Sequence, residues 1–309
     1  MKSLLTLIAI IFTGIAVNAQ TLYTKTYGNP KDKPLLFLHG GPGYNAVNFE
    51  QSTAEKLSKN GFYVIVYDRR GEGRSIDPNA KFNFEQSFKD IQLILKEKGI
   101  TKITLLGHSF GGVIATLFAE KHPEKVNQII LIAAPVALQE TFKTIIKSSK
   151  ALYEAKGDKT NLSYIGMLEN MDNSSLEYSS YCFGHAMQNG FYSPKQRTDE
   201  AKSIYATLKL DTLVKKYASS MTFEAPQGFW ANEKYTSIDL TNNIKSLLKM
   251  NLPIYGIYGK EDGLYSPAQI ESLTNLIGSN QVKYFDACSH NVFTDQQTLF
   301  IEAIKTWVK

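Results

Sequence analysis

The segment Gly107–Gly111, with the sequence GHSFG, places a serine between a strand and a helix. An apolar run, 103–106, precedes it, and a helix-forming stretch, 113–121, follows it. A G-x-S-x-G turn in this context holds its serine in a strained conformation, and its glycines let strand and helix approach closely. The pattern alone also occurs in ordinary glycine-rich loops, but both flanks match what the turn demands. The sequence therefore predicts Ser109 as a nucleophile.

Three histidines follow the predicted nucleophile, and one of them has the position of a general base. His122 ends the helix that begins at the nucleophile, so the helix carries it away, and it is expected to be a helix C-terminal residue. His185 has no strand beside it and is expected at the surface or in a pocket. His290 follows the apolar strand 282–288 and precedes the last helix, 294–308. This strand-to-helix loop is where the base is expected, since the acid and the base follow the nucleophile in that order.

Seven aspartates lie between the predicted nucleophile and the predicted base. Asp262 follows 253–259, the most strand-like run in that interval, and the acid of a triad belongs at the carboxyl end of a strand. Glu261 is adjacent and chemically able, whereas Asp286 lies inside the final strand and would have difficulty reaching the base. Asp262 is therefore the predicted third member of the triad.

A developing oxyanion needs backbone N–H donors, and the sequence offers two sources. One is the residue after the nucleophile, Phe110. The other is the loop 39–43, HGGPG, which follows the apolar strand 35–38. Within that loop Gly41 is the first choice of donor and Gly40 the second.

These residues together predict acyl transfer. His290, oriented by Asp262, takes the proton of Ser109 as the serine oxygen attacks a carbonyl carbon. The N–H groups of Phe110 and Gly41 stabilise the tetrahedral oxyanion. His290 then protonates the leaving group, and water repeats the cycle on the acyl-enzyme.

The first nineteen residues have the pattern of a secretory signal: one lysine, an apolar stretch from Leu4 to Val17, and small residues at 17–19 before Gln20. A membrane anchor would need about 20 apolar residues, more than this stretch offers. Cleavage would leave 309 − 19 = 290 residues, enough for one large core. We expect export to the periplasm or the extracellular space, with no membrane anchor after signal cleavage.

Charge and cysteine content limit the classes of ligand and partner that the sequence predicts. The formal charge of +5 becomes +4 once Lys2 is removed, and no basic block occurs, which gives no support to nucleic-acid binding. Cys182 and Cys288 are the only cysteines and are expected to be unpaired. No H-E-x-x-H or C-x-x-C spacing is present, so neither a metal nor a cofactor is expected.

Strands and helices are expected to alternate through the first half of the chain, in the order strand 34–39, helix 47–59, strand 62–67, helix 84–98, strand 102–107, helix 110–121 and strand 127–133. This alternation predicts an α/β fold whose mostly parallel sheet is covered by helices on both faces. The pattern stops at Pro135 and resumes at Pro253. We expect a core of residues 20–135 and 248–309, with 136–247 forming an inserted, largely helical lid.

The segment Asp68–Ser75, DRRGEGRS, follows the expected strand 62–67. It lacks the third glycine of a G-x-G-x-x-G nucleotide loop, and the chain has no Walker lysine pattern. We expect a structural turn near the site that holds neighbouring loops through its charges.

The motifs at 39–43, 68–75 and 107–112, with Asp262 and His290, together resemble the α/β-hydrolase superfamily across essentially the whole mature chain. The HGGPG loop is similar to that of the proline iminopeptidase family, whose members remove N-terminal residues, often proline, from short peptides. That resemblance implies the same fold and triad. The chain departs from the family at His108 and Phe110, where glycine and tryptophan are typical, and these two residues are more like those of esterases and lipases.

The resemblance also implies a lid carboxylate that holds the free amino terminus, since a buried ammonium needs a paired anion. Glu224 is the first candidate and Glu177 the second, although either is also consistent with a solvated lid glutamate. Six lid aromatics are candidates for an apolar pocket, and more often such residues pack a lid onto a sheet: Tyr178, Tyr181, Phe183, Phe191, Phe229 and Trp230. Few of them are expected to touch substrate.

Three functions stay open at this point. An aminopeptidase fits the HGGPG loop, a carboxylic ester hydrolase fits the GHSFG turn, and a non-catalytic ligand-binding relative is the third. A requirement for a free amine in a peptide substrate would separate the first two. The substrate is expected to be a small molecule or a short peptide, and the sequence does not specify an oligomeric state.

Overall fold

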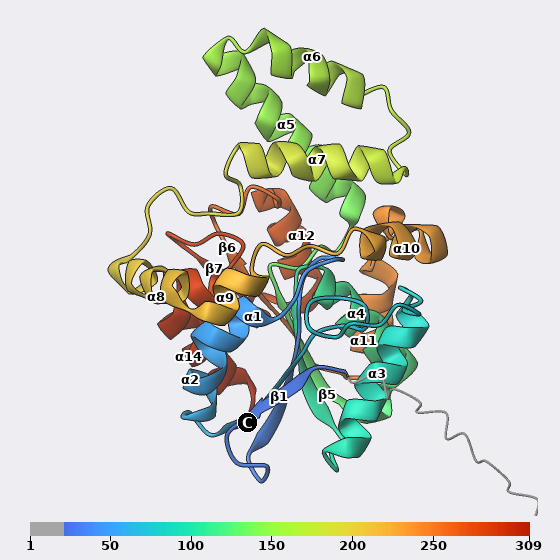
Figure 1. Cartoon of the computed structure of the whole chain (residues 1–309), viewed down its shortest axis with the longest axis vertical. Coiled ribbons are helices and arrows are strands. Elements are labelled where there is room, and N and C mark those ends of the chain that lie inside the picture. Colours follow the sequence, from blue (N-terminus) through green and yellow to red (C-terminus); the bar gives the residue numbers. More distant parts are fainter. Residues whose placement is uncertain (1–21) are drawn as a thin grey trace, which may run out of the picture.

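The structure, a computed structural model, describes residues 22–309. The expected signal, 1–19, lies outside the described residues. Within them the central layer is one seven-stranded sheet in the order β1-β3-β2-β4-β5-β6-β7 (Figure 1). Its strands are β1 (Thr24–Tyr27), β2 (Lys33–Leu38), β3 (Phe62–Tyr67), β4 (Ile103–His108), β5 (Val126–Ile132), β6 (Ile254–Gly259) and β7 (Val282–Phe285). Only the β1–β3 pair is antiparallel among the strand pairs of this sheet.

The inner strands are buried on both faces, which is why they are continuous apolar runs in the sequence. Every residue of β3 and β4 is buried. The expected strands 34–39, 62–67, 102–107 and 127–133 each agree with the structure to within one residue at either end. The edge strand β1 was not expected from the sequence, because its four residues are only half-buried and lack an apolar run.

The helices of the core form two layers, one on each face of the sheet (Figure 1). On one face α3 and α11 pack against α4, and on the other α1, α2 and α14 lie together. The core helices are α1 (Val47–Phe49), α2 (Glu55–Ser58), α3 (Phe84–Glu97), α4 (Phe110–Lys121), α11 (Thr241–Lys249), α12 (Pro267–Ile277), α13 (Val292–Asp295) and α14 (Gln297–Trp307). A π-helical turn, Glu50–Ala54, joins α1 to α2.

Between β5 and β6 the described chain is helical, and α5 to α7 rise above the strand ends (Figure 1). We refer to α5–α10, residues 138–233, as the lid. Its helices are α5 (Leu138–Lys156), α6 (Lys159–Leu168), α7 (Leu176–Gln188), α8 (Asp199–Leu210), α9 (Thr212–Tyr217) and α10 (Glu224–Glu233). The expected lid boundary at 247 falls inside α11, which packs on α4 and bonds it through Asn243 and Glu120.

None of the helices between residues 22 and 309 combines the length and apolarity of a membrane-spanning segment.

Candidate active site

Ser109 lies at the sharp turn between β4 and α4. Its backbone angles are φ 52° and ψ −124°, a sparsely populated conformation for a residue with a side chain. A Cβ at Gly111 would overlap the carbonyl oxygen of Leu38, and one at Gly107 would lie 2.6 Å from the Cα of Gly112. The glycines of the GHSFG segment are therefore required by close backbone packing, and the serine side chain remains partly exposed at the strand end.

Asp262 and His290 meet at the same edge of the sheet, after β6 and β7. The Nδ1 of His290 is 2.8 Å from Oδ2 of Asp262, and both side chains are buried. In the tautomer in which the Nδ1–H group donates this hydrogen bond to the carboxylate, Nε2 is the ring nitrogen available to accept a proton. His290 also lies beside the residue that precedes Ser109, since its carbonyl oxygen is 3.0 Å from Nε2 of His108 and the two rings are 4.9 Å apart. His290 is thus adjacent to the residue that precedes Ser109, and no hydrogen bond joins its ring to the serine hydroxyl among residues 22–309.

Two tyrosines shield the Asp262–His290 pair from water. The ring of Tyr192 meets that of His290 edge-on at 5.1 Å, and the ring of Tyr265 stacks on it at 6.3 Å. Burial raises the pKa of both phenols, with the nearby Asp262 charge adding to the shift. They stay neutral, and the hydroxyl of Tyr265 donates to the carbonyl oxygen of Ala133.

The HGGPG loop lies against Ser109. A Cβ at Gly40 would be 3.1 Å from the Cβ of Ser109, so only glycine fits there without displacement. The N–H of Gly41 has no hydrogen-bond acceptor among residues 22–309. Phe110 opens α4, where N–H groups have no intrahelical acceptor. These two N–H groups are therefore the candidate oxyanion donors.

A buried ion pair fixes the backbone of that loop. The guanidinium of Arg69 donates to the carbonyl oxygens of His39 and Gly40, and it is held by two 2.8 Å bonds to Glu72. Glu72 also accepts a 2.7 Å bond from the N–H of Gly43. Both side chains are at most 2% exposed. Charges near the site were expected from the sequence, but this pair was not, because no local pattern shows which side chain reaches the loop.

The imidazole of His39 completes this support as a neutral ring. Its Nε2 accepts a 3.0 Å bond from the backbone N–H of Arg69, and its Nδ1 lies 2.8 Å from the carbonyl oxygen of Gly40. Burial, followed by the charge of Arg69, lowers the pKa of His39 well below its usual value. An uncharged ring is the form that these two bonds require.

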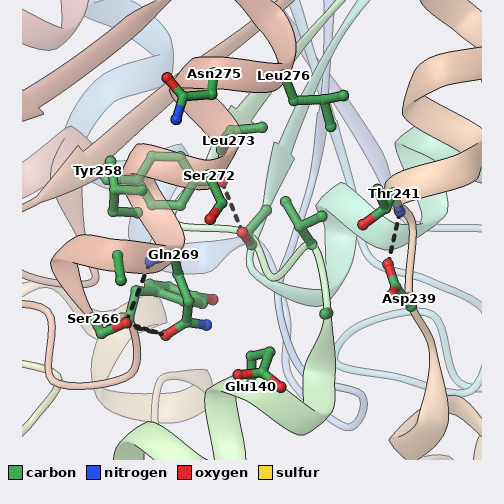
Figure 2. A pocket seen from close by; sticks show the side chains of 16 residues that line it. Glu140, Asp239, Thr241, Tyr258, Ser266, Gln269, Ser272, Leu273, Asn275 and Leu276 are labelled. Atoms are coloured by element: carbon green, nitrogen blue, oxygen red, sulfur yellow. Dashed lines mark hydrogen bonds between the residues drawn. The ribbon is translucent and has the colours of Figure 1, made fainter.

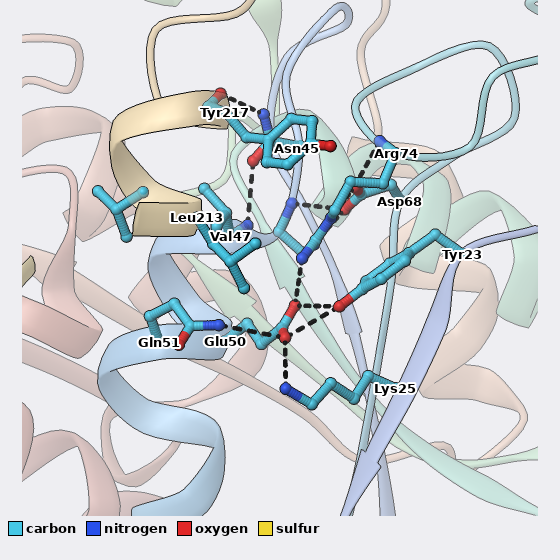
Figure 3. Close-up of polar contacts among 12 residues, drawn as sticks. Tyr23, Lys25, Asn45, Val47, Glu50, Gln51, Asp68, Arg74, Leu213 and Tyr217 are labelled. Carbon is cyan, nitrogen blue, oxygen red and sulfur yellow. Dashed lines mark hydrogen bonds and ion pairs between the residues drawn. The ribbon is translucent and has the colours of Figure 1, made fainter. Parts of the chain in front are cut away.

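A second charge network ties the segment after the HGGPG loop to the residue that precedes β1 (Figure 3). Asp68 accepts a 2.9 Å bond from the N–H of Ala46 and a 2.6 Å bond from Nε of Arg74. Arg74 reaches on to Glu50 at 2.6 Å, and the hydroxyl of Tyr23 donates to the same carboxylate at 3.0 Å. The DRRGEGRS turn thus holds neighbouring segments through its charges.

A profile described as alpha/beta hydrolase fold matches residues 33–296, most of the described chain. The chain belongs to the α/β-hydrolase fold family. The expected fold and resemblance are confirmed.

Named relatives of this α/β hydrolase include proline iminopeptidases. That of Lactobacillus delbrueckii subsp. bulgaricus is 26% identical over 94% of this chain and 95% of its own. That of Saccharolobus solfataricus is 25% identical over 97% of this chain and 95% of its own. Among solved structures, a proline iminopeptidase-related protein from Thermus thermophilus superposes with a TM-score of 0.65 at 23% identity, covering 93% and 94% of the two chains. An esterase from Exiguobacterium antarcticum gives 0.58 at 20%, covering 93% and 95%.

In this hydrolase Phe110 faces the lid. Its ring packs edge-on against Phe229 at 5.1 Å and Tyr235 at 5.4 Å, and it lies 6.1 Å from Phe84. The side chain after Ser109 therefore anchors α10 and the segment that follows it. Of the six lid aromatics, Tyr178 and Phe183 pack in the same way, against Phe142.

The two candidate lid carboxylates are both exposed. Glu177 lies in the first turn of α7 and Glu224 in the first turn of α10. Neither has a cationic partner within 4.0 Å in the described part of the chain. Glu224 is nevertheless flanked by residues that touch the HGGPG loop. The N–H of Thr222 donates to the carbonyl oxygen of Gly43 at 2.9 Å, and Pro226 borders the same glycine.

Trp230 has a packing contact rather than an open position. Its Nε1 donates to the carbonyl oxygen of Ser174 at 2.8 Å, and Lys234 lies over its ring at 3.7 Å. This ties α10 to the segment before α7. The structure does not bring Trp230 to the triad through any contact of its own.

Two of the cavities in the described chain each have a wall residue beside His290, and their lining residues do not include Ser109, Asp262 or His290. The hinge cavity, about 600 Å³, lies between α12 and the two chain crossings into the lid (Figure 2). Tyr265, which stacks on His290, is part of its wall. The α8 cavity, about 510 Å³, lies between α1, α8 and α9 and is lined by Asn291, the neighbour of His290.

The remaining histidines and the cysteines lie elsewhere. His122 bonds Gln92 at the end of α4, and His185 bonds Tyr153 at 2.9 Å within the lid. Cys182 and Cys288 are both buried and not bonded to each other. Between residues 22 and 309 no cluster of three or more histidine, cysteine or acidic side chains has the geometry to hold a metal.

Proposed function

We propose that this chain is an exported serine hydrolase that acts as an aminopeptidase on short peptides, in the manner of proline iminopeptidases. The observation that carries the proposal is the buried 2.8 Å bond between Asp262 and His290, beside a serine held in a strained turn. The HGGPG loop and the relatives named proline iminopeptidase support the substrate class.

In the proposed mechanism His290 removes the proton of Ser109 while the serine oxygen attacks the carbonyl carbon of the first residue. Asp262 holds the ring in the tautomer with Nε2 free and stabilises the imidazolium that forms. The negative charge on the carbonyl oxygen is stabilised by the N–H groups of Gly41 and Phe110. His290 then protonates the leaving amine, and a water molecule, activated by the same ring, releases the acyl group.

The buried surroundings support this chemistry in two ways. Arg69 and Glu72 lock the carbonyls of the HGGPG loop, so the N–H of Gly41 points to a fixed place before substrate arrives. Donors that need no rearrangement stabilise a transition state more than flexible ones. Tyr192 and Tyr265 keep water from the Asp262–His290 pair, where electrostatic interactions are therefore stronger.

The test is hydrolysis by the mature chain, residues 20–309, of prolyl and alanyl anilides and of short and medium acyl nitrophenyl esters. Ser109→Ala is the blank. We expect the anilides to be cleaved and the cleavage to be lost when their amino group is acylated. Export is tested separately, by N-terminal sequencing of the protein secreted by a host, with Gln20 as the expected first residue.

Ester hydrolysis is the second candidate. The His108 and Phe110 neighbours of the nucleophile and the exposed position of both candidate carboxylates favour it. Cleavage of esters but not of anilides by the same preparation would replace the aminopeptidase proposal with this one.

A further inference from the structure

The α8 cavity has an unusual balance of charge. Arg197, Lys202 and Lys209 line it, and no aspartate or glutamate does. The hinge cavity has the opposite balance, with Glu140 and Asp239 in its wall and no lysine or arginine. The ammonium of Lys202 is partly engaged, since it lies 2.8 Å from Asp199, so Arg197 and Lys209 are the cations left for a ligand. A cavity with this lining favours an anion.

Arg197 differs from the other three arginines of the described chain. Arg69, Arg70 and Arg74 all form ion pairs with carboxylates. Arg197 has no carboxylate within 4.0 Å in residues 22–309, and instead its guanidinium lies over the ring of Tyr205 at 3.9 Å. Stacking leaves the edge of a guanidinium, with its paired N–H donors, free to bind a carboxylate.

The platform under Arg197 is connected to the catalytic loop. The hydroxyl of Tyr205 donates to Asp295 at 3.0 Å, and the other oxygen of Asp295 accepts the N–H of Ser289 at 2.9 Å. Ser289 precedes His290, and Asn291, which follows it, lines the cavity. The carboxylate of Asp295 is thus bonded to the loop and to Tyr205. Tyr205, over whose ring the guanidinium of Arg197 lies, is thereby connected to the loop of the proposed base.

We propose that the α8 cavity binds the C-terminal carboxylate of the peptide that leaves. This inference rests on the proposed aminopeptidase function. His290 donates a proton to the leaving amine, so the leaving peptide must extend from the serine toward the His290 side of the site. That is the side on which Asn291 and the cavity lie. The preferred substrate is then a short peptide with a free carboxyl end, whose charge Arg197 and Lys209 bind.

Substrate length measures the distance from the serine to the cations, because each added residue extends a peptide by at most about 3.6 Å. The experiment compares kcat/KM for prolyl peptides of two to five residues as free acids and as C-terminal amides. For the acid over the amide we expect a preference of about five- to tenfold at one or two lengths, mainly in KM, as fits one partly exposed charge-assisted contact. R197Q should reduce that preference to less than about twofold without changing hydrolysis of a prolyl anilide, which has no carboxylate.

Lys215→Gln is the matched control, since Lys215 lies on α9 but does not line the cavity. It should keep the wild-type preference, and Lys209→Gln should lose part of it. R197K, which keeps the charge but not the paired donors, should give an intermediate value.

Equal rates for acids and amides at every length, with peptides cleaved normally, would overturn the inference and leave the aminopeptidase proposal intact. If no peptide is cleaved, the proposed function fails, and binding decides the inference by itself. Calorimetry with Ser109→Ala then compares the same acids and amides, and tighter binding of the acid that R197Q removes would support an anion site. Equal binding, or none, would overturn it.

Discussion

The core half of the site and the lid half are built differently. In the core, two polar pairs of the candidate site are buried, Asp262 with His290 and Arg69 with Glu72, and their four side chains are at most 5% exposed. Ser109 alone among the candidate triad is partly exposed. In the lid, the charged candidates Glu177, Glu224 and Arg197 are exposed, and none has an ion-pair partner within residues 22–309. If the proposed function holds, the buried pairs belong to the reaction centre and the exposed charges to the surface that selects substrates.

This difference in burial predicts how strongly a substitution affects the protein in each region. A buried charge needs a partner, because removing one member leaves the other desolvated and unpaired. An exposed charge is hydrated whether or not it has a partner, so its loss changes little except the ligand it meets. Core substitutions should therefore affect reaction rate or stability strongly, and lid substitutions should affect substrate preference modestly.

The largest expected effect is that of Ser109→Ala on turnover. Without the serine oxygen no acyl-enzyme can form, so kcat on the best substrate should fall by a factor on the order of 10⁴ to 10⁶. Labelling by an organophosphonate should be lost as well, while the thermal unfolding midpoint stays close to that of the wild type. His290→Gln should behave alike, whereas His122→Gln and His185→Gln should lose far less. Activity that persists in Ser109→Ala would contradict the role of Ser109 as nucleophile, and the core would then not be the reaction centre.

The sequence predicts residues that follow a recognisable strand better than it predicts contacts between distant segments. Ser109 and Asp262 follow β4 and β6, whose residues are mostly buried, and such strands are visible as local apolar runs. His290 follows β7, which is only half-buried but still precedes the last helices of the chain. In contrast, the contact of Arg69 with the HGGPG loop joins residues 30 positions apart and has no local signature. Pairing across the fold therefore had to come from the structure.

The lid was the least predictable part for a related reason. Its helices can be expected from composition and periodicity, but which face meets the site depends on how the lid docks. Trp230 was a candidate for the pocket and in fact bonds Ser174, while Phe110, a candidate for its N–H alone, supplies the aromatic anchor of the lid. Arg197 was not singled out, because an exposed arginine in a polar stretch has no distinctive pattern.

The second effect is on stability, through Glu72→Gln. The change leaves the guanidinium of Arg69 buried without a counter-charge, so the free energy of unfolding should fall by about 3–5 kcal/mol. Urea denaturation measures it. Glu85→Gln, which removes an exposed partner of Lys89, is the control and should unfold at the wild-type urea concentration. Equal midpoints for the two variants would mean that the buried pair is not what fixes the loop.

The third effect concerns Asp295, which joins the His290 loop to the lid. Burial is the main cause that raises the pKa of Asp295 from 3.8 to about 6. The folded state therefore binds the proton of the Asp295 carboxyl more tightly than the unfolded state does. Its contribution to the free energy of unfolding is complete below about pH 3.8 and is lost as the pH rises through 6. The difference of about 2 pKa units corresponds to roughly 3 kcal/mol.

Asp295→Asn should therefore flatten the fall in unfolding free energy between pH 4 and 6.5, measured by denaturation at each pH. Tyr205→Phe removes one donor to the ionised carboxylate and should extend the wild-type fall to higher pH. A wild-type slope in Asp295→Asn would assign the titration to another group.

The smallest effects are expected at the lid carboxylates. They test whether substitution of an exposed lid charge changes substrate preference only modestly. Glu224→Gln lies next to the residues that touch Gly43, so it should raise KM for peptides with a free amino terminus by up to about tenfold and leave ester hydrolysis unchanged. Glu177 has no such neighbour, so Glu177→Gln should change the rates of peptide and ester hydrolysis by less than about twofold. Parallel KM and kcat measurements on a prolyl anilide and a nitrophenyl ester distinguish these outcomes. A loss of more than about a hundredfold in kcat for Glu224→Gln would mean that an exposed lid charge becomes buried and paired in the substrate complex. Substitutions in the lid would then reduce activity as strongly as substitutions in the core.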